Sequence, residues 1–240
     1  MRITVVVPTY NEAENLPVLA RSLLALGPDI RLLVVDDNSP DGTGAEADRL
    51  AAAHPDQVAV HHRPVRQGLR SAYLEGFRIA VEAKPDAVAQ MDADLSHEPG
   101  CLLAMGNALE RADLVLGSRY VPGGSVDQRW PAWRKGLSAF GNQYARTILG
   151  LPQRDLTTGF RLWRSDALER MPLHDVRANG YVFLVEMAYL AHALGLRIAE
   201  VPIHFPDRSR GESKMSLRIQ VEAAFRVWQM KWDHERRRGA

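Results

Sequence analysis

The sequence predicts an α/β protein in which helices flank a mostly parallel sheet, and three observations lead to that prediction. Short runs rich in valine and leucine alternate with longer amphipathic stretches throughout the first half of the chain. These runs are apolar at nearly every position, which is typical of strands covered on both faces. With 240 residues, of which 46% are hydrophobic and 25% charged, the chain can also bury one sizeable core.

The expected elements of the first half alternate along the chain, an order that favours right-handed crossovers between parallel strands. Pro8 is expected to end the first strand, because proline cannot donate a hydrogen bond to a neighbouring strand. The predicted strands are Ile3–Val7, Ile30–Asp36, Val58–His62, Ala87–Met91 and Leu114–Gly117. The predicted helices are Glu12–Ala25, Thr43–Ala53, Leu69–Ala83 and Pro99–Glu110.

The second half of the chain is less regular. Pro122, Gly123 and Gly124 mark a loop over Val121–Trp130. Beyond it we expect a helix over Arg134–Leu149, a turn or short strand over Asp155–Trp163, a helix over Phe183–Leu194, a strand over Arg197–Val201 and a polar loop or hairpin over Ile203–Lys214.

A last helix is expected to start at a cap on Ser213 or Ser216 and to run to about Arg236. Its apolar residues recur at spacings of three and four and so form one face. That face either packs on the core or lies at a membrane interface, with Arg236–Arg238 on anionic lipid. The residues of this face are Leu217, Val221, Ala224, Phe225, Trp228 and Trp232.

The net charge and the cysteine count of the chain exclude or disfavour several kinds of partner and site. A net charge of +1 gives no case for a nucleic-acid partner, although the basic stretch Lys231–Arg238 could meet an anionic surface. Cys101 is the single cysteine, which excludes an internal disulfide and a multi-cysteine zinc site. The first strand is too short for a secretory signal, and no run approaches the roughly 18 apolar residues of a membrane span. We therefore expect a cytoplasmic protein.

The sequence Met91-Asp92-Ala93-Asp94 ends a predicted strand with two carboxylates that point the same way. Two ionised carboxylates side by side are costly without a counter-charge. A divalent cation with oxygen ligands, Mg²⁺ or Mn²⁺, supplies that charge when it is clamped between protein and phosphate. A polar strand exit with no ligand is the alternative reading of these residues.

Polar loops follow four of the predicted strands, and in a parallel sheet these loops meet at one edge. They are Pro8–Glu12, Asp36–Gly42, Asp92–Asp94 and Gly117–Tyr120. The chain has no Gly-x-Gly-x-x-Gly after its first strand and no Gly-x-x-x-x-Gly-Lys-Ser/Thr. A dinucleotide-binding dehydrogenase and a P-loop NTPase are therefore disfavoured, and the loops predict a different phosphate-binding site.

These four loops resemble those of the inverting family 2 glycosyltransferases of GT-A fold. The second half resembles more specifically the polyprenol-phosphate (dolichol-phosphate) mannose synthases, in a short form without membrane helices. The similarity covers about residues 3–217. The motifs that carry it are Arg134-Lys-x-x-Ser138 with Asn142, Asp155-Leu-Thr-Thr-Gly-Phe-Arg161, Gly180-Tyr-Val-Phe-x-x-Glu-Met187, Val201-Pro-Ile-x-Phe-x-Asp-Arg208 and Gly211-Glu-Ser-Lys214.

The resemblance implies a Rossmann-like GT-A domain over residues 1–212, followed by an amphipathic helix over 213–240. Residues 1–120 would form the nucleotide-sugar half and residues 121–212 the acceptor half. Some relatives have a metal-binding glutamine where Ser96 stands, so a third protein ligand stays open. The implied site consists of Pro8, Tyr10, Glu12, Val35 and Asp37 at the nucleoside, Asp92, Ala93 and Asp94 at the diphosphate and metal, Arg119, Arg208 and Lys214 at the donor phosphates and sugar, and Arg134 and Ser138 at the lipid phosphate.

The reaction implied is transfer of mannose from GDP-mannose to polyprenyl monophosphate with inversion. Asp92 and Asp94 would be the metal ligands, and Asp94, Arg119, Arg208 and Lys214 the groups nearest the chemistry. Lys135 and Arg161 are further candidate phosphate donors, and His97 is either a neighbour of the metal site or a simple loop residue. The lipid would lie along the Leu137–Leu149 helix at the cytoplasmic membrane surface, and the need for a separate membrane-protein partner is left open.

Three alternatives remain at this point. A UDP-glucose-dependent polyprenyl-phosphate glucosyltransferase would keep the fold and change the sugar. A transferase with a sugar or protein acceptor would share only the first-half motifs. A non-catalytic subunit at the membrane surface would keep the nucleotide-sugar fold, but the two carboxylates and the Arg/Lys set are intact. Trp130 and Trp133 could stack on a sugar, mark the membrane interface or be structural.

Overall fold

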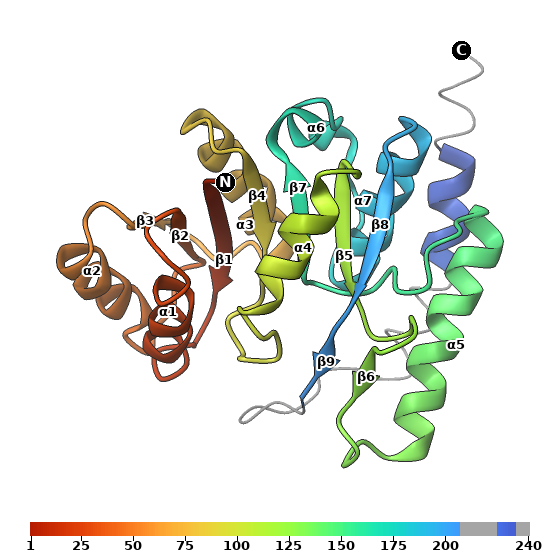
Figure 1. Ribbon diagram of the computed structural model, residues 1–240, viewed down its shortest axis with the longest axis horizontal. Coiled ribbons are helices and arrows are strands. Elements are labelled where there is room, and N and C mark those ends of the chain that lie inside the picture. The colour runs from red at the N-terminus through yellow and green to blue at the C-terminus, as the bar shows by residue number, and fades with distance from the viewer. Residues whose placement is uncertain (207–224, 234–240) are drawn as a thin grey trace.

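The structure is a computed structural model that describes residues 1–206 and 225–233 (Figure 1). Within these residues, a seven-stranded sheet has the order β3-β2-β1-β4-β7-β5-β8. A short parallel pair, β6 (Ser125–Val126) and β9 (His204–Phe205), lies apart from it. The strands of the main sheet are β1 (Ile3–Thr9), β2 (Ile30–Asp36), β3 (Val58–His62), β4 (Ala87–Gln90), β5 (Leu114–Ser118), β7 (Arg161–Arg164) and β8 (Ile198–Pro202).

The predicted α/β class with a mostly parallel sheet is confirmed. One strand breaks the parallel order, because β7 runs antiparallel between β4 and β5. Its position was not predicted, since the sequence over Asp155–Trp163 indicated only a turn or short strand. The insertion of β7 separates β4 from β5, so the loops that follow these two strands lie on either side of the segment that leads into β7.

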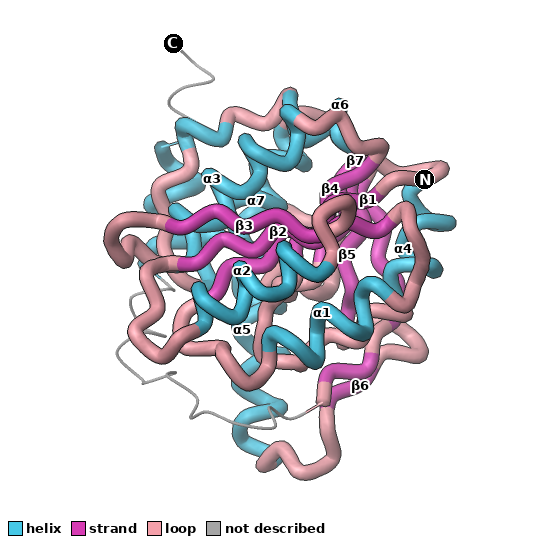
Figure 2. Tube along the Cα trace, turned by 90° about the vertical axis from the view of Figure 1, so that its left-hand side faces the viewer, coloured by secondary structure: helices cyan, strands magenta, loops and turns pink. Residues whose placement is uncertain are grey.

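Helices cover both faces of the sheet (Figure 2). On one face, α1 (Leu16–Leu24), α2 (Thr43–Ala53) and α4 (Cys101–Leu109) pack against alternate strand residues. On the other, α3 (Leu69–Glu82), α6 (Ser165–Glu169) and α7 (Tyr181–Ala193) pack against the intervening residues. The further helical elements are α5 (Ala132–Leu149) and the 3₁₀ turn Leu173–Asp175.

Two element boundaries near the first strand differ from the prediction. The strand β1 continues through Pro8, which is in register with Val35, and the Asp37 N–H donates to the Thr9 carbonyl at 2.9 Å. Proline removes only its own donor, so pairing resumes at the next residue. The helix α1 begins at Leu16 rather than at Glu12, and the N–H groups of Glu12 and Ala13 donate instead to the side chains of Thr43 and Asp41.

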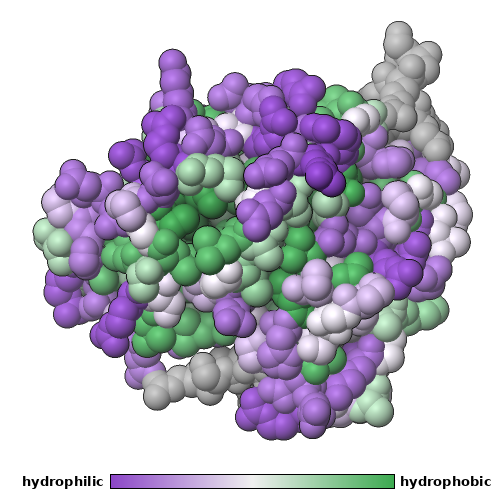
Figure 3. All heavy atoms as spheres, in the orientation of Figure 1, coloured by the Kyte–Doolittle hydropathy of each residue, from purple (hydrophilic) through white to green (hydrophobic). Residues whose placement is uncertain are grey.

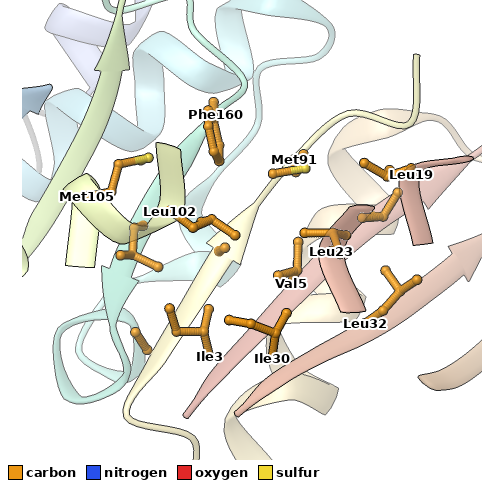
Figure 4. Packing of buried hydrophobic residues seen from close by; sticks show 14 of the residues in the cluster. Ile3, Val5, Leu19, Leu23, Ile30, Leu32, Met91, Leu102, Met105 and Phe160 are labelled. Atoms are coloured by element: carbon orange, nitrogen blue, oxygen red, sulfur yellow. The ribbon is translucent and has the colours of Figure 1, made fainter. Parts of the chain in front are cut away.

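The apolar core on the α1 and α4 face runs the length of the strands (Figure 4). Ile3 and Ile30 lie at one end of the cluster, and Met91 and Phe160 lie at the other. Met91 and Phe160 are fully buried, and each such side chain contributes about 1.5–3 kcal/mol on burial. The core therefore fixes the residue that immediately precedes Asp92.

The described part of the last helix, residues 225–233, lies beside α5 (Figure 1). Val227 and Met230 pack in the core cluster, whereas Phe225, Trp228 and Trp232 are 69%, 47% and 63% exposed. The core-packed reading of the predicted apolar face is therefore wrong for these three aromatic residues, because the helix buries a different side. The other members of that face and both candidate caps lie outside the described residues.

The surface also carries hydrophobic residues elsewhere. The space-filling view shows them on the face over α1 and α4, with hydrophilic residues around them (Figure 3). Val18 on α1 and Leu103 on α4 are 47% and 63% exposed. Within the described ranges, no helix is both long and apolar enough to cross a bilayer.

Helix α3 packs against the sheet through a glycine, and this contact gives a stability prediction. A Cβ on Gly76 would overlap Cγ1 of Val6 and lie 3.0 Å from Cγ2 of Val35. We expect Gly76→Ala to lower the free energy of unfolding by about 1–3 kcal/mol through overpacking. The matched control Gly141→Ala, at a helical glycine with open space, should raise it by about 0.5–1 kcal/mol. Urea unfolding measures both, and equal effects would contradict the packing account.

Candidate active site

The first two predicted loops are joined at the carboxyl edge of β1 and β2. The Asn11 N–H donates to the Ser39 hydroxyl at 3.1 Å, and the Glu12 N–H donates to the Thr43 hydroxyl at 2.9 Å. The Thr9 hydroxyl also donates to Asp36 at 2.9 Å. These bonds confirm that the two loops meet at one edge, as the topology predicted. Pro8 and Val35, both expected at the nucleoside, are buried register partners beneath them.

Asp37 is buried and pairs with a cation that the sequence reasoning missed. The buried Arg63 guanidinium donates to Asp37, and the N–H groups of Gln67 and Gly68 donate to it at 3.0 and 2.7 Å. Arg63 also donates to Glu75 at 2.8 Å. Asp37 therefore organises the 63–68 loop, and its expected contact with a nucleoside stays a prediction.

Tyr10 lies at the rim of this edge, under a side chain from the same 63–68 loop. The Arg66 guanidinium stands over the Tyr10 ring at 3.7 Å from the ring centre. Such a cation–π contact contributes about 0.5–1 kcal/mol at an exposed site. The expected contact of Tyr10 with a nucleoside stays a prediction, and it would occur next to a cation, Arg66, that sequence reasoning did not single out.

The two carboxylates of the Asp-x-Asp are held differently. Asp92 accepts a hydrogen bond from the Tyr73 hydroxyl at 2.9 Å, and its Oδ2 is 3.5 Å from Nε2 of His97. Asp94 accepts from the Ser96 N–H at 3.1 Å and from the Ser96 hydroxyl. Ser96 thus orients Asp94, and Ala93 is buried between the two carboxylates.

The loop that carries these carboxylates is strained at Leu95, whose φ is 61°. The left-handed region costs a non-glycine residue roughly 1–2 kcal/mol. Strain of this kind persists where surrounding contacts over-determine it, as they do at functional sites. The two bonds from Ser96 to Asp94 are such contacts, because they close the turn around Leu95.

Tyr73 and His97 are buried and lie next to the Asp92 carboxylate. Burial first, and then the Asp92 charge, raise the pKa of Tyr73 well above its usual range, so the hydroxyl keeps its proton and donates. His97 is 3% exposed and stacks on Phe160 at 5.1 Å between ring centres. His97 is therefore a buried neighbour of the metal-site candidate, which was one of its two predicted readings.

Arg119 follows β5, and a buried carboxylate holds its guanidinium. The backbone N–H, Nε and Nη2 of Arg119 donate to Asp155 at 2.7–2.9 Å. Asp155 is fully buried, and Arg119 is 9% exposed. Asp155 belongs to a motif that the sequence analysis quoted, but it had no assigned role. The expected contact of Arg119 with donor phosphates stays a prediction, made from a side chain already fixed in direction.

A hydrogen-bonded chain leads from Arg119 to the helix α5. Nη2 of Arg119 also donates to the Thr157 hydroxyl at 2.8 Å, and Nδ2 of Asn142 donates to the same hydroxyl at 3.1 Å. Asn142 also donates to the Ser138 carbonyl at 3.1 Å. In addition, the Tyr120 hydroxyl donates to that of Ser138 at 2.6 Å. The predicted donor-phosphate and lipid-phosphate residues are therefore neighbours through this network.

An aromatic chain connects Arg134 to the same site. The Arg134 guanidinium stands over the Trp130 ring at 3.7 Å, and Trp130 meets Phe205 edge-on at 5.7 Å. Phe205 in turn contacts His97 at 5.5 Å and faces Arg119 at 5.2 Å. Trp130 is 6% exposed and packs between Arg134 and Phe205, whereas Trp133 is 69% exposed.

The expectation that Arg161 serves as a phosphate donor is wrong. Arg161 is fully buried, and its guanidinium donates to the backbone carbonyls of Leu156 and Thr158 at 2.8 and 3.0 Å. Burial lowers its pKa to about 10, against the opposing effect of Asp155. Arg161 therefore supports the 156–158 turn as a buried cation. Lys135 extends outward and donates to the Gln128 carbonyl at 3.1 Å.

Arg208 and Lys214, which were expected at the donor phosphates and sugar, lie outside the described residues.

Asp92 and Asp94 offer hard oxygen donors, which fits Mg²⁺ or Mn²⁺. In the part of the chain that the structure describes, no group of three or more His, Cys, Asp or Glu could hold a metal. The fit is thus to a cation that takes its remaining ligands from a diphosphate or from water.

Comparison with known proteins identifies the family of this chain. Residues 4–171 match the family model described as glycosyl transferase family 2. The chain is 44% identical to the polyprenol monophosphomannose synthase of Mycolicibacterium smegmatis, with 99% of this chain and 91% of that protein aligned. It is 46% identical to the undecaprenyl-phosphate mannosyltransferase of Micrococcus luteus, with 95% and 93% aligned.

A solved structure shows the same fold. The mannosyltransferase of Pyrobaculum calidifontis, in complex with GDP-Man and Mn²⁺, superposes with a TM-score of 0.62 at 21% identity. The alignment covers 92% of this chain and 60% of that one. At 21% identity the superposition is evidence for a shared fold only, and it confirms the predicted GT-A architecture.

The buried pair of Arg119 and Asp155 gives a stability prediction. Asp155→Asn keeps the shape but leaves the guanidinium beside a neutral amide, which should cost about 3–5 kcal/mol. Glu82→Gln disrupts an ion pair with Arg78 in which both side chains are over 60% exposed, and it should cost less than about 1 kcal/mol. Chemical unfolding of both variants is the measurement. Similar losses would show that burial does not set the strength of the Asp155 pair.

Proposed function

Because the chain belongs to glycosyl transferase family 2, we propose that it transfers mannose from GDP-mannose to a polyprenyl monophosphate. The anomeric carbon is inverted, and the products are polyprenyl β-phosphomannose and GDP. Both relatives compared above are named for lipid-linked mannosyl products or acceptors, and more than nine tenths of each is aligned with this chain. The observation that carries the proposal is the network from Arg119 to Ser138.

That network matters because the two substrates are both phosphates. In the proposed arrangement the donor diphosphate lies at Asp92, Asp94 and Arg119, and the lipid phosphate lies at Arg134 and Ser138. The Thr157 hydroxyl accepts hydrogen bonds from both Arg119 and Asn142, so the two regions are held at a fixed separation. Arg134 suits phosphate, because a planar guanidinium can donate two hydrogen bonds at once. Nε and Nη2 of Arg119 already donate to Asp155, so Arg119 would contribute positive charge rather than a two-bond fork.

The bonding changes are simple. An oxygen of the lipid phosphate attacks the anomeric carbon, and the bond from that carbon to the diphosphate oxygen breaks, so that its electron pair leaves with GDP. The attacking phosphate is already an anion at neutral pH, so Asp94 is not needed as a base, and its bonds to Ser96 suit an orienting role. A divalent cation held by Asp92 and Asp94 would neutralise the charge that develops on the leaving group.

We expect transfer of labelled mannose from GDP-mannose to short-chain polyprenyl phosphate in detergent. EDTA should abolish it, and Mg²⁺ or Mn²⁺ should restore it. Asp92→Asn should lower kcat at least about 100-fold, in line with the loss of one preorganised electrostatic contact. The matched control is Asp48→Asn, because Asp48 is exposed and pairs with His62 outside the site. Competition with UDP-glucose distinguishes the sugar, and transfer of glucose in place of mannose would contradict the proposal.

We further propose that the lipid is met at the membrane surface through an aromatic ridge, which we define as Trp133, Phe140, Phe225, Trp228 and Trp232. Each of these side chains is between 47% and 69% exposed. Trp133 and Phe140 flank Arg134 and Ser138 on α5. Exposed aromatic residues beside cations are suited to the headgroup level of a bilayer. The proposed contact is peripheral and on the cytoplasmic face.

The aromatic ridge predicts membrane binding that can be separated from catalysis. Phe225→Ala with Trp232→Ala should lower partitioning onto vesicles that contain anionic lipid by about tenfold or more, because buried aromatic area is lost. Transfer to a short-chain acceptor in detergent should be unchanged. Leu103→Ala removes an exposed apolar side chain from α4 and serves as the control. Unchanged binding of the double variant would reject the ridge, and binding that requires added membrane proteins would indicate a separate membrane-protein partner.

A further inference from the structure

Asp92 is bounded on three sides by residues that the proposed reaction does not use. Tyr73 approaches one oxygen, with its hydroxyl 2.9 Å from Oδ1. His97 and Gly159 approach the other, with Nε2 of His97 3.5 Å from Oδ2. A Cβ built on Gly159 would lie 2.7 Å from the same Oδ2. The Asp92 side chain is nevertheless 31% exposed, so solvent and solutes can reach it.

Tyr73 is itself held rigidly. Its side chain is fully buried, and its ring stacks on Phe77 at 5.7 Å and on Phe183 at 6.0 Å between ring centres. The helix that carries it is pressed onto the sheet at Gly76, where a Cβ would overlap Val6. Helix α3 and the aromatic stack therefore fix the position of the hydroxyl independently of the Asp92 loop.

A buried hydroxyl aimed at a metal-binding carboxylate has a known physical consequence. Partners of this kind hold a ligand in the orientation that suits the metal, and their loss weakens metal affinity by about 10- to 100-fold. The backbone of the Asp92 loop is strained at Leu95. A contact from outside the loop, such as the Tyr73 hydroxyl, therefore helps to hold Asp92 in place. Without the Tyr73 hydroxyl, the Asp92 carboxylate would lose one of the contacts that set its orientation.

We propose that Tyr73 is a positioning residue for metal binding, whose hydroxyl fixes the Asp92 carboxylate in the orientation that receives a divalent cation and the donor diphosphate. This inference rests on the proposed metal-dependent transfer and adds a residue to it. Tyr73 does not touch the reacting atoms, and it acts only through Asp92. Its phenyl ring provides packing, and its hydroxyl provides the orientation.

The test measures metal affinity directly. Mn²⁺ binding in the presence of GDP is followed by electron paramagnetic resonance, which requires neither lipid nor mannose. Tyr73→Phe keeps the aromatic stack and removes the hydroxyl, and we expect Mn²⁺ to bind about 10- to 100-fold more weakly. In the transfer assay, the Mn²⁺ concentration for half-maximal rate should rise by a similar factor, and excess Mn²⁺ should restore most of kcat.

Two further variants separate orientation from folding. Gly159→Ala crowds Oδ2 and leaves the Tyr73 hydroxyl in the chain, and it should also weaken Mn²⁺ binding if the carboxylate orientation is what matters. Tyr144→Phe removes a hydroxyl that accepts from Trp228 at 3.0 Å on α5, and its Mn²⁺ affinity should equal that of the wild type. Thermal unfolding of each variant reports on the fold.

The outcomes are distinguishable. Weaker Mn²⁺ binding by Tyr73→Phe, with a folded protein and rescue by excess metal, supports the inference. A Tyr73→Phe protein that binds Mn²⁺ within twofold of the wild type overturns it and leaves the proposed function intact. A wild-type protein that binds no Mn²⁺ in the presence of GDP overturns both the inference and the metal-dependent part of the proposed function.

Discussion

The buried ion pair between Arg119 and Asp155 is the interaction on which the rest of the site depends. It joins the end of β5 to the 155–157 turn through three N–H donors. The same turn contacts Asn142 of α5, because the N–H groups of Leu156 and Thr157 donate to the side-chain Oδ1 of Asn142 at 2.8 and 3.2 Å. Without the pair, the edge of the sheet and the helix that carries Ser138 would share few fixed contacts.

Buried cations accompany acidic residues along the carboxyl edge. Arg63 lies beneath Asp37, and Arg119 lies against Asp155. Arg161, fully buried, interacts electrostatically with Asp155 and Asp92. A buried carboxylate is tolerated when it is paired and hydrogen-bonded. The edge can therefore hold several carboxylates in fixed orientations before any metal or phosphate arrives, which is the preorganisation that electrostatic catalysis requires.

A series of ring contacts connects His97, the neighbour of Asp92, to Arg134 on helix α5. His97 stacks on Phe160 and meets Phe205, which contacts Trp130, over which Arg134 stands. The contacts among His97, Phe160, Phe205 and Trp130 are between large ring side chains with few rotatable bonds, so their relative positions leave little freedom. The rings thus connect the partly exposed carboxylate Asp92 to helix α5, which carries exposed aromatic residues.

The sequence alone determined the strands that follow local patterns, the loops at their ends and the pair Asp92 and Asp94, because apolar runs and the residues that follow them are properties of neighbouring positions. It could not distinguish Arg161, which is fully buried, from Arg134, which is at the surface, since their chemistry is the same. Only the tertiary structure inserted β7 between β4 and β5, aimed Tyr73 at Asp92 and turned Trp232 outward. These features depend on contacts between residues distant in the sequence, which no local pattern records.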